Sequence, residues 1–342
     1  MELIRVAASG EAMLNGAAVS PGGRVFSSFP RWTPVPSPSV AEATPEGGFR
    51  PFPGNQWNEW QPGMPPENAI VNAHSVYADR FNKLWVIDDA TPRVCPPVDG
   101  ASKLIKIDLH SNAVERVYRF SLDFLPPGSV LGHMRVDGRF AYVTESHHDA
   151  AIIVVDLESG AARKVLAGHP LTQADPKATA MIQGREFRAR NGGVPQVHVD
   201  LLELSRDGKW LYFAALLGPM LRRVPTAVLQ DAALSDAEVA ASVEDVIAIP
   251  PLAGLARDVR DNLYICAFTQ DAILRLAPGA KTLETLITDP RISFPNEGCV
   301  GPDGFFYFPG SQIHRSARFG DGTSQVQLPF EVMKIRVGET RD

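Results

Sequence analysis

The densest group of side chains able to move protons lies in "ESHHDA", residues 145–150. A histidine titrates close to neutral pH, so either imidazole of this motif could transfer a proton while a nearby carboxylate fixes its tautomer. Adjacent residues of a strand point to opposite faces, so at most one of His147 and His148 would face a shared site. Glu145 and His148 are therefore candidate catalytic groups, and an ordinary surface loop is the alternative interpretation.

Polar residues also stand where apolar strands are expected to begin. They are Asn15, Asn72, His74, His133, Asp200, Asn296 and Glu297. A buried polar group without a partner costs about 1–3 kcal/mol, so these groups should bond one another, ordered water, a cation or a ligand. His74 and His133 are candidates for proton transfer. Asn15 and Asn72 are candidates for binding a substrate.

Four loops that join the second and third strands of the predicted sheets form another candidate set. They are residues 88–95, 145–150, 269–272 and 310–316. These loops are expected at the same end of the fold as the strand starts, which makes Asp89 and Gln270 candidate substrate-binding residues. His314 and Arg315 could hold a carboxylate, because a guanidinium matches carboxylate geometry. A surface turn is the alternative for that pair.

These residues belong to a pattern of polar start, apolar strand, turn rich in Asp, Gly or Asn, and aromatic-rich strand. Its six copies begin at Asn15, Asn72, Leu131, Asp200, Leu252 and Asn296. Most copies are followed by a more amphipathic strand pair, as in "AIIVVDLESGAARKVL" from Ala151. Four antiparallel strands repeated in this way predict an all-β fold, a six-bladed β-propeller of four-stranded antiparallel blades, with residues 1–342 as a single domain. Two β-sandwiches are the alternative.

One segment departs from the strand pattern. Residues 225–246 place apolar side chains at helical spacing and carry a capping box formed by Ser235 and Glu238. The segment therefore predicts a short helical insertion within the propeller.

Charge, the N-terminal stretch and the motifs each exclude a class of function. The formal net charge is -6 and Lys and Arg form no run, so nucleic acid is not an expected partner. The start, "MELIRVAASGEAMLNG", has no apolar run long enough for a signal peptide or a membrane span, so a cytoplasmic protein without membrane association is expected. No phosphate-binding loop, dinucleotide fingerprint or nucleophile elbow is present, so no nucleotide cofactor is expected. No pattern predicts an oligomeric state.

Several motifs resemble the major royal jelly protein and yellow family, in particular its bacterial branch. They include "GRVFSSFPRW" at 23–32, "NKLWVID" at 82–88, "LIKIDL" at 104–109, "RRVPTAVL" at 222–229 and the C-terminal stretch from Ser311. The resemblance covers essentially the whole chain and implies a six-bladed propeller. Some members of the family resemble dopachrome-converting isomerases, others are binding proteins, and the bacterial branch is grouped with gluconolactonase-like propellers.

The resemblance also implies a metal site. In gluconolactonase-like propellers a Glu, an Asn and an Asp hold the metal, and "FPNEG" at 294–298 resembles the strand start that supplies the Asn, with Glu297 in place of a Gly. Oxygen donors suit Ca²⁺, Mg²⁺ or Mn²⁺, whereas imidazoles favour Zn²⁺. The predicted metal ligands are Asn72, Asp200, Asn296 and Glu297.

The leading hypothesis is a metal-assisted hydrolase of a small polar molecule, with a lactone as the preferred substrate, acting at the mouth of the central channel. One alternative is an isomerase or tautomerase of the dopachrome-converting type, which needs an acid and a base but no metal. The other is a propeller that binds a small ligand without turnover.

Overall fold

Short strands make up most of the structure. The computed structural model describes residues 1–338, and within them six four-stranded antiparallel sheets form the blades of a six-bladed β-propeller, as predicted. The chain divides into two compact units, each with three of these sheets. The first unit contains residues 1–132, residues 296–311 and a C-terminal segment that begins at Leu328, and the second contains residues 133–295 and 312–327.

Three sheets form the first unit. The first consists of β2 (Ala17–Val19), β3 (Val25–Ser28), β4 (Val40–Ala43) and β5 (Phe49–Pro51). The second consists of β6 (Ala73–Ala78), β7 (Lys83–Asp88), β8 (Lys103–Asp108) and β9 (Ala113–Arg119). The third has the order β24 (Cys299–Val300), β25 (Phe305–Gly310), β26 (Phe330–Arg336) and β1 (Leu3–Ser9). A short 3-10 helix, η1 (Gln56–Asn58), lies between β5 and β6.

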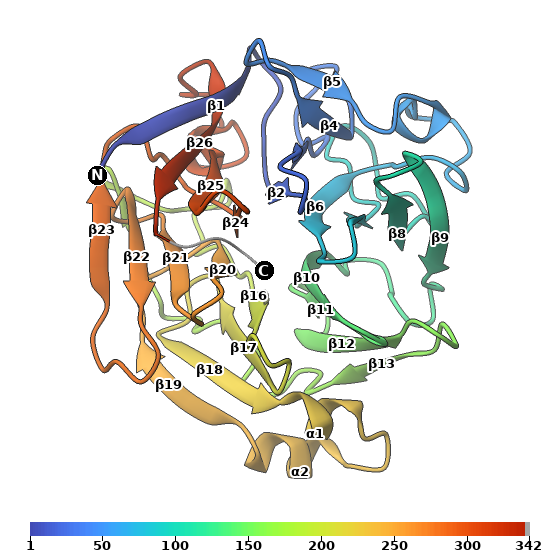
Figure 1. Ribbon diagram of the computed structural model, residues 1–342, viewed down its shortest axis with the longest axis vertical. Helices are drawn as coiled ribbons and strands as arrows, with labels where there is room; N and C mark the ends of the chain where they lie inside the picture. The colour runs from blue at the N-terminus through green and yellow to red at the C-terminus, as the bar shows by residue number, and fades with distance from the viewer. Residues whose placement is uncertain (339–342) are drawn as a thin grey trace. The chain divides into compact units, whose positions relative to one another are not determined.

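The third sheet joins the two ends of the chain. Figure 1 shows β1, near the N-terminus, beside β26, near the C-terminus. The two strands are antiparallel, with Leu3 opposite Ile335 and Ser9 opposite Phe330, and the register shifts once between Arg5 and Ala7. No strand is expected from the sequence at residues 3–9, so only the structure reveals β1 and its pairing.

Three further sheets form the second unit. The first consists of β10 (Leu131–Asp137), β11 (Phe140–Glu145), β12 (Ala151–Asp156) and β13 (Ala162–Val165). The second consists of β16 (Val199–Leu204), β17 (Trp210–Ala215), β18 (Met220–Pro225) and β19 (Glu244–Ala248). The third consists of β20 (Leu255–Arg257), β21 (Leu263–Ala267), β22 (Ala272–Leu276) and β23 (Glu284–Thr288). A two-stranded hairpin, β14 (Met181–Ile182) with β15 (Arg185–Glu186), and a 3-10 helix, η2 (Ile313–Arg315), complete the unit.

The predicted helical insertion is confirmed. Two short helices, α1 (Thr226–Gln230) and α2 (Asp236–Ala241), connect β18 to β19. The capping box is present, because the Ser235 side chain accepts from the backbone of Glu238 and the Glu238 side chain accepts from the backbone of Ser235. In the described part of the chain, no helix has both the length and the apolar character needed to cross a bilayer.

The apolar core lies between neighbouring sheets. In the second unit, Tyr142 and Ile152 from the β10–β13 sheet pack with Leu202 and Phe213 from the β16–β19 sheet, and all four are buried. Burying each such side chain contributes about 1.5–3 kcal/mol. Strands with both faces covered in this way require the near-continuous apolar runs seen in the sequence.

An aspartate closes several of the hairpin turns. Asp258 accepts hydrogen bonds from the backbone N–H groups of Arg260 and Asn262 at 2.9 and 3.0 Å, and from the Tyr264 hydroxyl at 2.8 Å. Asp79 accepts in the same way from two backbone N–H groups and from the Trp85 ring nitrogen. The repeated turn of Asp, Gly or Asn before an aromatic strand therefore has a local cause. The carboxylate satisfies the turn and anchors the aromatic side chain.

We expect Asp258→Ala to lower the free energy of unfolding by about 1.5–3 kcal/mol, because Asp258 is buried and its loss leaves several donors without an acceptor. Urea denaturation followed by circular dichroism measures this change. The matched control is Asp245→Ala, which removes a carboxylate from the exposed pair with Arg222 and should cost less than about 1 kcal/mol. Equal losses in the two variants would contradict the anchoring role of Asp258.

Candidate functional site

Two of the polar strand starts coincide with irregularities in their strands. The pairing of β6 with β7 shifts register between Ala73 and Ser75, so His74 is the extra residue. The pairing of β16 with β17 shifts between Val199 and Leu201, so Asp200 is the extra residue. A β-bulge redirects a side chain away from the regular alternation and is over-represented beside functional sites. The unusual polar residues at these starts are therefore accommodated by local changes in the ladder.

His74 and Asp89 form a buried pair in the first unit. The His74 Nδ1 atom lies 3.0 Å from the Asp89 Oδ2 atom. The other Asp89 oxygen accepts from the Asn72 side-chain amide at 2.7 Å and from the Thr91 backbone at 2.9 Å. Burial raises the pKa of the Asp89 carboxyl, but the hydrogen bond and charge of His74 and the bond from Asn72 together bring that pKa below its ordinary value. Asp89 is therefore ionised at neutral pH.

An ionised Asp89 determines the tautomer of His74. A carboxylate only accepts hydrogen bonds, so the proton of the neutral imidazole is assigned to Nδ1, and Nε2 carries the basic lone pair. Trp32 packs edge-on against the His74 ring, with the two ring centroids 5.4 Å apart. The orientation of the imidazole is thus fixed by a charge on one side and an aromatic ring on another.

The other polar strand starts of this unit are hydrogen-bonded to one another. The Asn15 side-chain amide donates to the His74 backbone carbonyl at 2.8 Å, and the Asn296 side-chain amide donates to the Asn15 Oδ1 atom at 2.8 Å. Ser75 donates to the Glu297 carboxylate at 2.5 Å. A Cβ at Gly16 would lie 2.9 Å from the same carboxylate, so the close approach requires glycine there. Asn15, His74, Asn296 and Glu297 therefore form one network, which was one of the arrangements that the sequence left open.

Three of the four predicted metal ligands, Asn72, Asn296 and Glu297, are already bonded to protein groups. The Asn72 side chain accepts from the Arg31 backbone N–H at 2.6 Å and donates to Asp89. The Asn296 side chain accepts from the Glu297 backbone at 2.8 Å while it donates to Asn15. Among residues 1–338, no three or more His, Cys, Asp or Glu side chains are grouped as a metal site would require. A cation here would have to displace existing hydrogen bonds, so the metal site stays a prediction.

His133 and Asp200 belong to the second unit, where Thr144 connects them. The His133 backbone N–H donates to the Thr144 hydroxyl at 2.9 Å, and this hydroxyl donates to the Asp200 backbone carbonyl at 2.7 Å. Both side chains are buried. Within the described residues the Oδ1 atom of Asp200 has no hydrogen-bond partner. The Thr144 hydroxyl therefore links the backbones of His133 and Asp200 and leaves their side chains out of this contact.

The "ESHHDA" loop has a structural explanation. The Glu145 carboxylate is fully buried and accepts hydrogen bonds from the backbone N–H groups of the next residues. These donors are His147, His148, Asp149 and Ala150, at 3.1, 2.9, 2.6 and 2.9 Å. The His148 side chain is exposed and its Nδ1 atom lies 2.6 Å from Asp149. Because Glu145 closes its own loop, this geometry does not support the catalytic role predicted for it.

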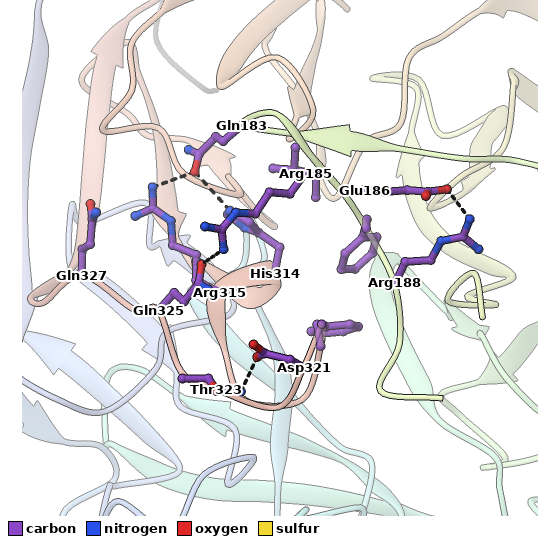
Figure 2. A pocket seen from close by; sticks show the side chains of 14 residues that line it. Gln183, Arg185, Glu186, Arg188, His314, Arg315, Asp321, Thr323, Gln325 and Gln327 are labelled. Carbon is purple, nitrogen blue, oxygen red and sulfur yellow. Dashed lines mark hydrogen bonds and ion pairs between the residues drawn. The ribbon is translucent and has the colours of Figure 1, made fainter. Parts of the chain in front are cut away.

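A cavity of about 480 Å³ lies in the second unit between two segments, residues 182–188 and 314–327. Figure 2 shows Arg185, His314 and Arg315 converging beneath the Gln183 side chain. The Gln183 amide oxygen accepts from Arg315 Nη2 at 2.7 Å and lies 3.3 Å from His314 Nε2. The Gln183 amide nitrogen donates to both Asp271 carboxylate oxygens, at 3.1 and 3.3 Å. The two predicted residues His314 and Arg315 therefore line a real cavity.

Burial controls the charge of the cavity wall. Desolvation, together with the neighbouring charge of Arg315, lowers the pKa of His314 to about 4, so this imidazole is neutral at physiological pH. Its Nδ1 atom is buried and has no hydrogen-bond partner among residues 1–338. Desolvation also lowers the pKa of Arg315, although the charge of Asp271 acts in the opposite direction. The guanidinium stays protonated, so the wall carries positive charge.

The cavity is lined by Gln183, which the sequence did not single out, and not by the predicted Gln270. Gln270 is exposed in the turn between β21 and β22 and does not line the cavity, whereas its neighbour Asp271 bonds Gln183. Gln183 and Gly184 form the tip of the β14–β15 hairpin, with φ angles of 51° and 79°. Gly184 is the one signal in the sequence, because a two-residue turn of this kind needs positive φ and glycine adopts it readily.

Comparisons with known proteins agree with this architecture. Residues 71–283 match the family model described as major royal jelly protein. A search of curated proteins finds no match. Among solved structures, a luciferin-regenerating enzyme shares 9% identity over 100% of this chain and 97% of that chain, with a TM-score of 0.60. A streptogramin B lyase shares 12% identity over 97% and 96%, with a TM-score of 0.55. Virginiamycin B lyase from Staphylococcus aureus shares 12% identity over 98% of each chain, with a TM-score of 0.54. At these identities the structures support the fold alone.

Proposed function

The chain belongs to the major royal jelly protein family, and we propose that it is an enzyme that acts on a small polar molecule by acid–base catalysis at His74. The observation that carries the proposal is the buried contact between His74 Nδ1 and the Asp89 carboxylate. A histidine oriented by an ionised carboxylate through one ring nitrogen is an arrangement suited to general acid–base catalysis. This arrangement needs no metal ion.

The reaction that we place first is the isomerisation of a carbonyl compound. His74 would remove a proton from the carbon next to the carbonyl group and return it at a second position, so the imidazole is regenerated in each turnover. The charge of Asp89 would stabilise the imidazolium formed between the two transfers.

The second candidate is metal-assisted hydrolysis of a lactone, with Ca²⁺, Mg²⁺, Mn²⁺ or Zn²⁺ as the cation. Asn296 donates to Asn15, and Asn15 donates to the His74 backbone. This second candidate is favoured because a predicted metal ligand and His74 thus belong to one network. If a cation replaced these bonds, the Asn296 and Glu297 oxygens would bind it, and it would polarise the carbonyl group of the lactone. The isomerisation proposed first does not depend on this cation.

A substrate panel with and without chelator separates these reactions. The purified chain is incubated with lactones and with enolisable ketones, before and after treatment with EDTA, and again after addition of Ca²⁺, Mn²⁺ or Zn²⁺. We expect turnover of an enolisable compound that survives EDTA. Lactone hydrolysis that disappears with EDTA and returns with a cation would replace the first reaction by the second. Ligands that raise the melting temperature without any turnover would contradict both and indicate a binding protein.

A further inference from the structure

Two arginines of the second-unit cavity are bonded to neutral amides rather than to carboxylates. Arg315 donates to the side-chain oxygens of Gln183 and Gln312 at 2.7 and 3.1 Å. Arg185 donates to the side-chain oxygen of Gln325. By contrast, Arg188 lines the same cavity and is paired with Glu186 at 2.5 Å. In the described part of the chain, neither Arg185 nor Arg315 has a carboxylate within ion-pair distance.

The nearest acids act on these arginines from beyond ion-pair distance, Asp271 on Arg315 and Asp321 on Arg185. The Asp271 carboxylate, whose charge acts on Arg315, is hydrogen-bonded to the Gln183 amide nitrogen. The Asp321 carboxylate accepts from the Thr323 backbone at 2.8 Å. A guanidinium forms stronger hydrogen bonds to an anion than to an amide, and its planar fork matches the two oxygens of a carboxylate. Exchange of an amide oxygen for a carboxylate oxygen at Arg315 is therefore favourable.

Gln183 occupies the position that such an oxygen would take. Its amide oxygen lies between Arg315 Nη2 and His314 Nε2. Because the amide nitrogen faces Asp271, the oxygen must accept, so the proton of the neutral His314 is assigned to Nε2. Gln183 is exposed at the tip of a two-residue turn. With its amide withdrawn, the cavity would present a guanidinium and an imidazole N–H to an incoming oxygen.

An aromatic wall lies beside the arginines. The rings of Phe187 and Phe319, which both line the cavity, are 4.7 Å apart between centroids and tilted by 40°. Phe187 also contacts Phe294, with centroids 5.9 Å apart, and Phe294 stacks on the His314 ring at 5.8 Å. The aromatic cluster is continuous with the imidazole, so a flat apolar body attached to an anion would contact both features. The volume of about 480 Å³ suits a small molecule.

We propose that this cavity is a binding site for a small aromatic carboxylate. The carboxylate is held by Arg185 and Arg315, where the amide oxygens of Gln325 and Gln183 now lie, and the ring contacts Phe187 and Phe319. The site is built from residues of the second unit alone. It does not depend on the chemistry proposed for His74 and Asp89.

Calorimetric titration of the intact chain with benzoate tests the proposal. We expect binding of benzoate that exceeds binding of acetate, which lacks the ring, of benzamide, which lacks the charge, and of inorganic phosphate, which has a different anion. Arg315→Gln and Arg185→Gln should each weaken benzoate binding about 10- to 100-fold, the loss expected for a charged hydrogen bond. The matched control is Arg188→Gln, which should bind benzoate as the unmodified chain does, because the Arg188 charge is already paired.

A second variant tests the role of Gln183. Gln183→Ala removes the competing amide oxygen and should bind benzoate severalfold more tightly. Absence of benzoate binding at millimolar concentration, equal binding of phosphate, or equal losses in the Arg188 and Arg315 variants would overturn the proposal. Thermal melting of every variant shows whether it is folded. His74→Ala should keep benzoate binding unchanged, so failure of this proposal and failure of the proposed enzyme activity are distinguishable.

Discussion

His74→Ala should reduce turnover of the enolisable substrate about 10²- to 10⁴-fold, the range expected when a general acid–base group is removed. The effect should fall on kcat rather than on KM, because the imidazole is proposed to act in the proton-transfer step. Steady-state kinetics on the purified variant measures both parameters. Asp89→Asn should also lower kcat, since an asparagine can no longer fix the Nδ1 proton or stabilise the imidazolium.

The matched control for this prediction is His110→Ala. His110 is exposed in the turn between β8 and β9 of the same sheet as His74, so its loss removes a histidine without touching the network. This variant should retain full activity. Equal activities of the His74 and His110 variants would rule out His74 as the proton-transfer group. An Asp89→Asn variant with an unchanged pH profile would rule out the orienting role of the carboxylate.

The architecture was predictable because its signals are local. Several hairpins are encoded by apolar strands and by a turn whose aspartate bonds backbone groups two to four residues away, as at Asp258. The capping box that starts α2 likewise spans Ser235 to Glu238. Features of this kind depend on neighbours in the sequence, so their residue types alone identify them.

Long-range partners were not predictable in the same way. The strand at residues 3–9 pairs with β26 near the other end of the chain, and no local pattern indicates that partner. His74 and Asp89 were separate candidates, one for catalysis and one for substrate binding. Their contact depends on the register of β6 against β7, including the bulge at His74. Residue types identified the candidates, but only the fold determines which of them touch.

The cavity of the second unit contains residues that the sequence predicted and residues that it did not. His314 and Arg315 were predicted from their side chains and their loop, and both line it. Gln183 and Arg185 were missed because their hairpin lies outside the repeated pattern and contains no strongly characteristic residue. The long-range bond between Gln183 and Arg315 becomes visible only once the two segments are placed together.

Glu145→Ala should lower the free energy of unfolding by about 2–4 kcal/mol, because four backbone N–H groups of the loop lose their acceptor. Urea denaturation at neutral pH measures the change. Glu145→Gln should be intermediate, since an amide oxygen replaces part of the lost acceptor while its nitrogen faces donors.

His148→Ala is the control in the same loop, and its exposed side chain should contribute less than about 0.5 kcal/mol. The stability and the turnover of the Glu145 variants also distinguish a catalytic role from a structural role for the "ESHHDA" loop. A Glu145 variant that unfolds like the unmodified chain but loses turnover would restore the catalytic role predicted from the motif. A variant that loses stability and keeps turnover, measured below its melting temperature, would assign the carboxylate to the loop. The second result is expected, because the Glu145 carboxylate accepts four backbone hydrogen bonds and would have to break some of them to transfer a proton.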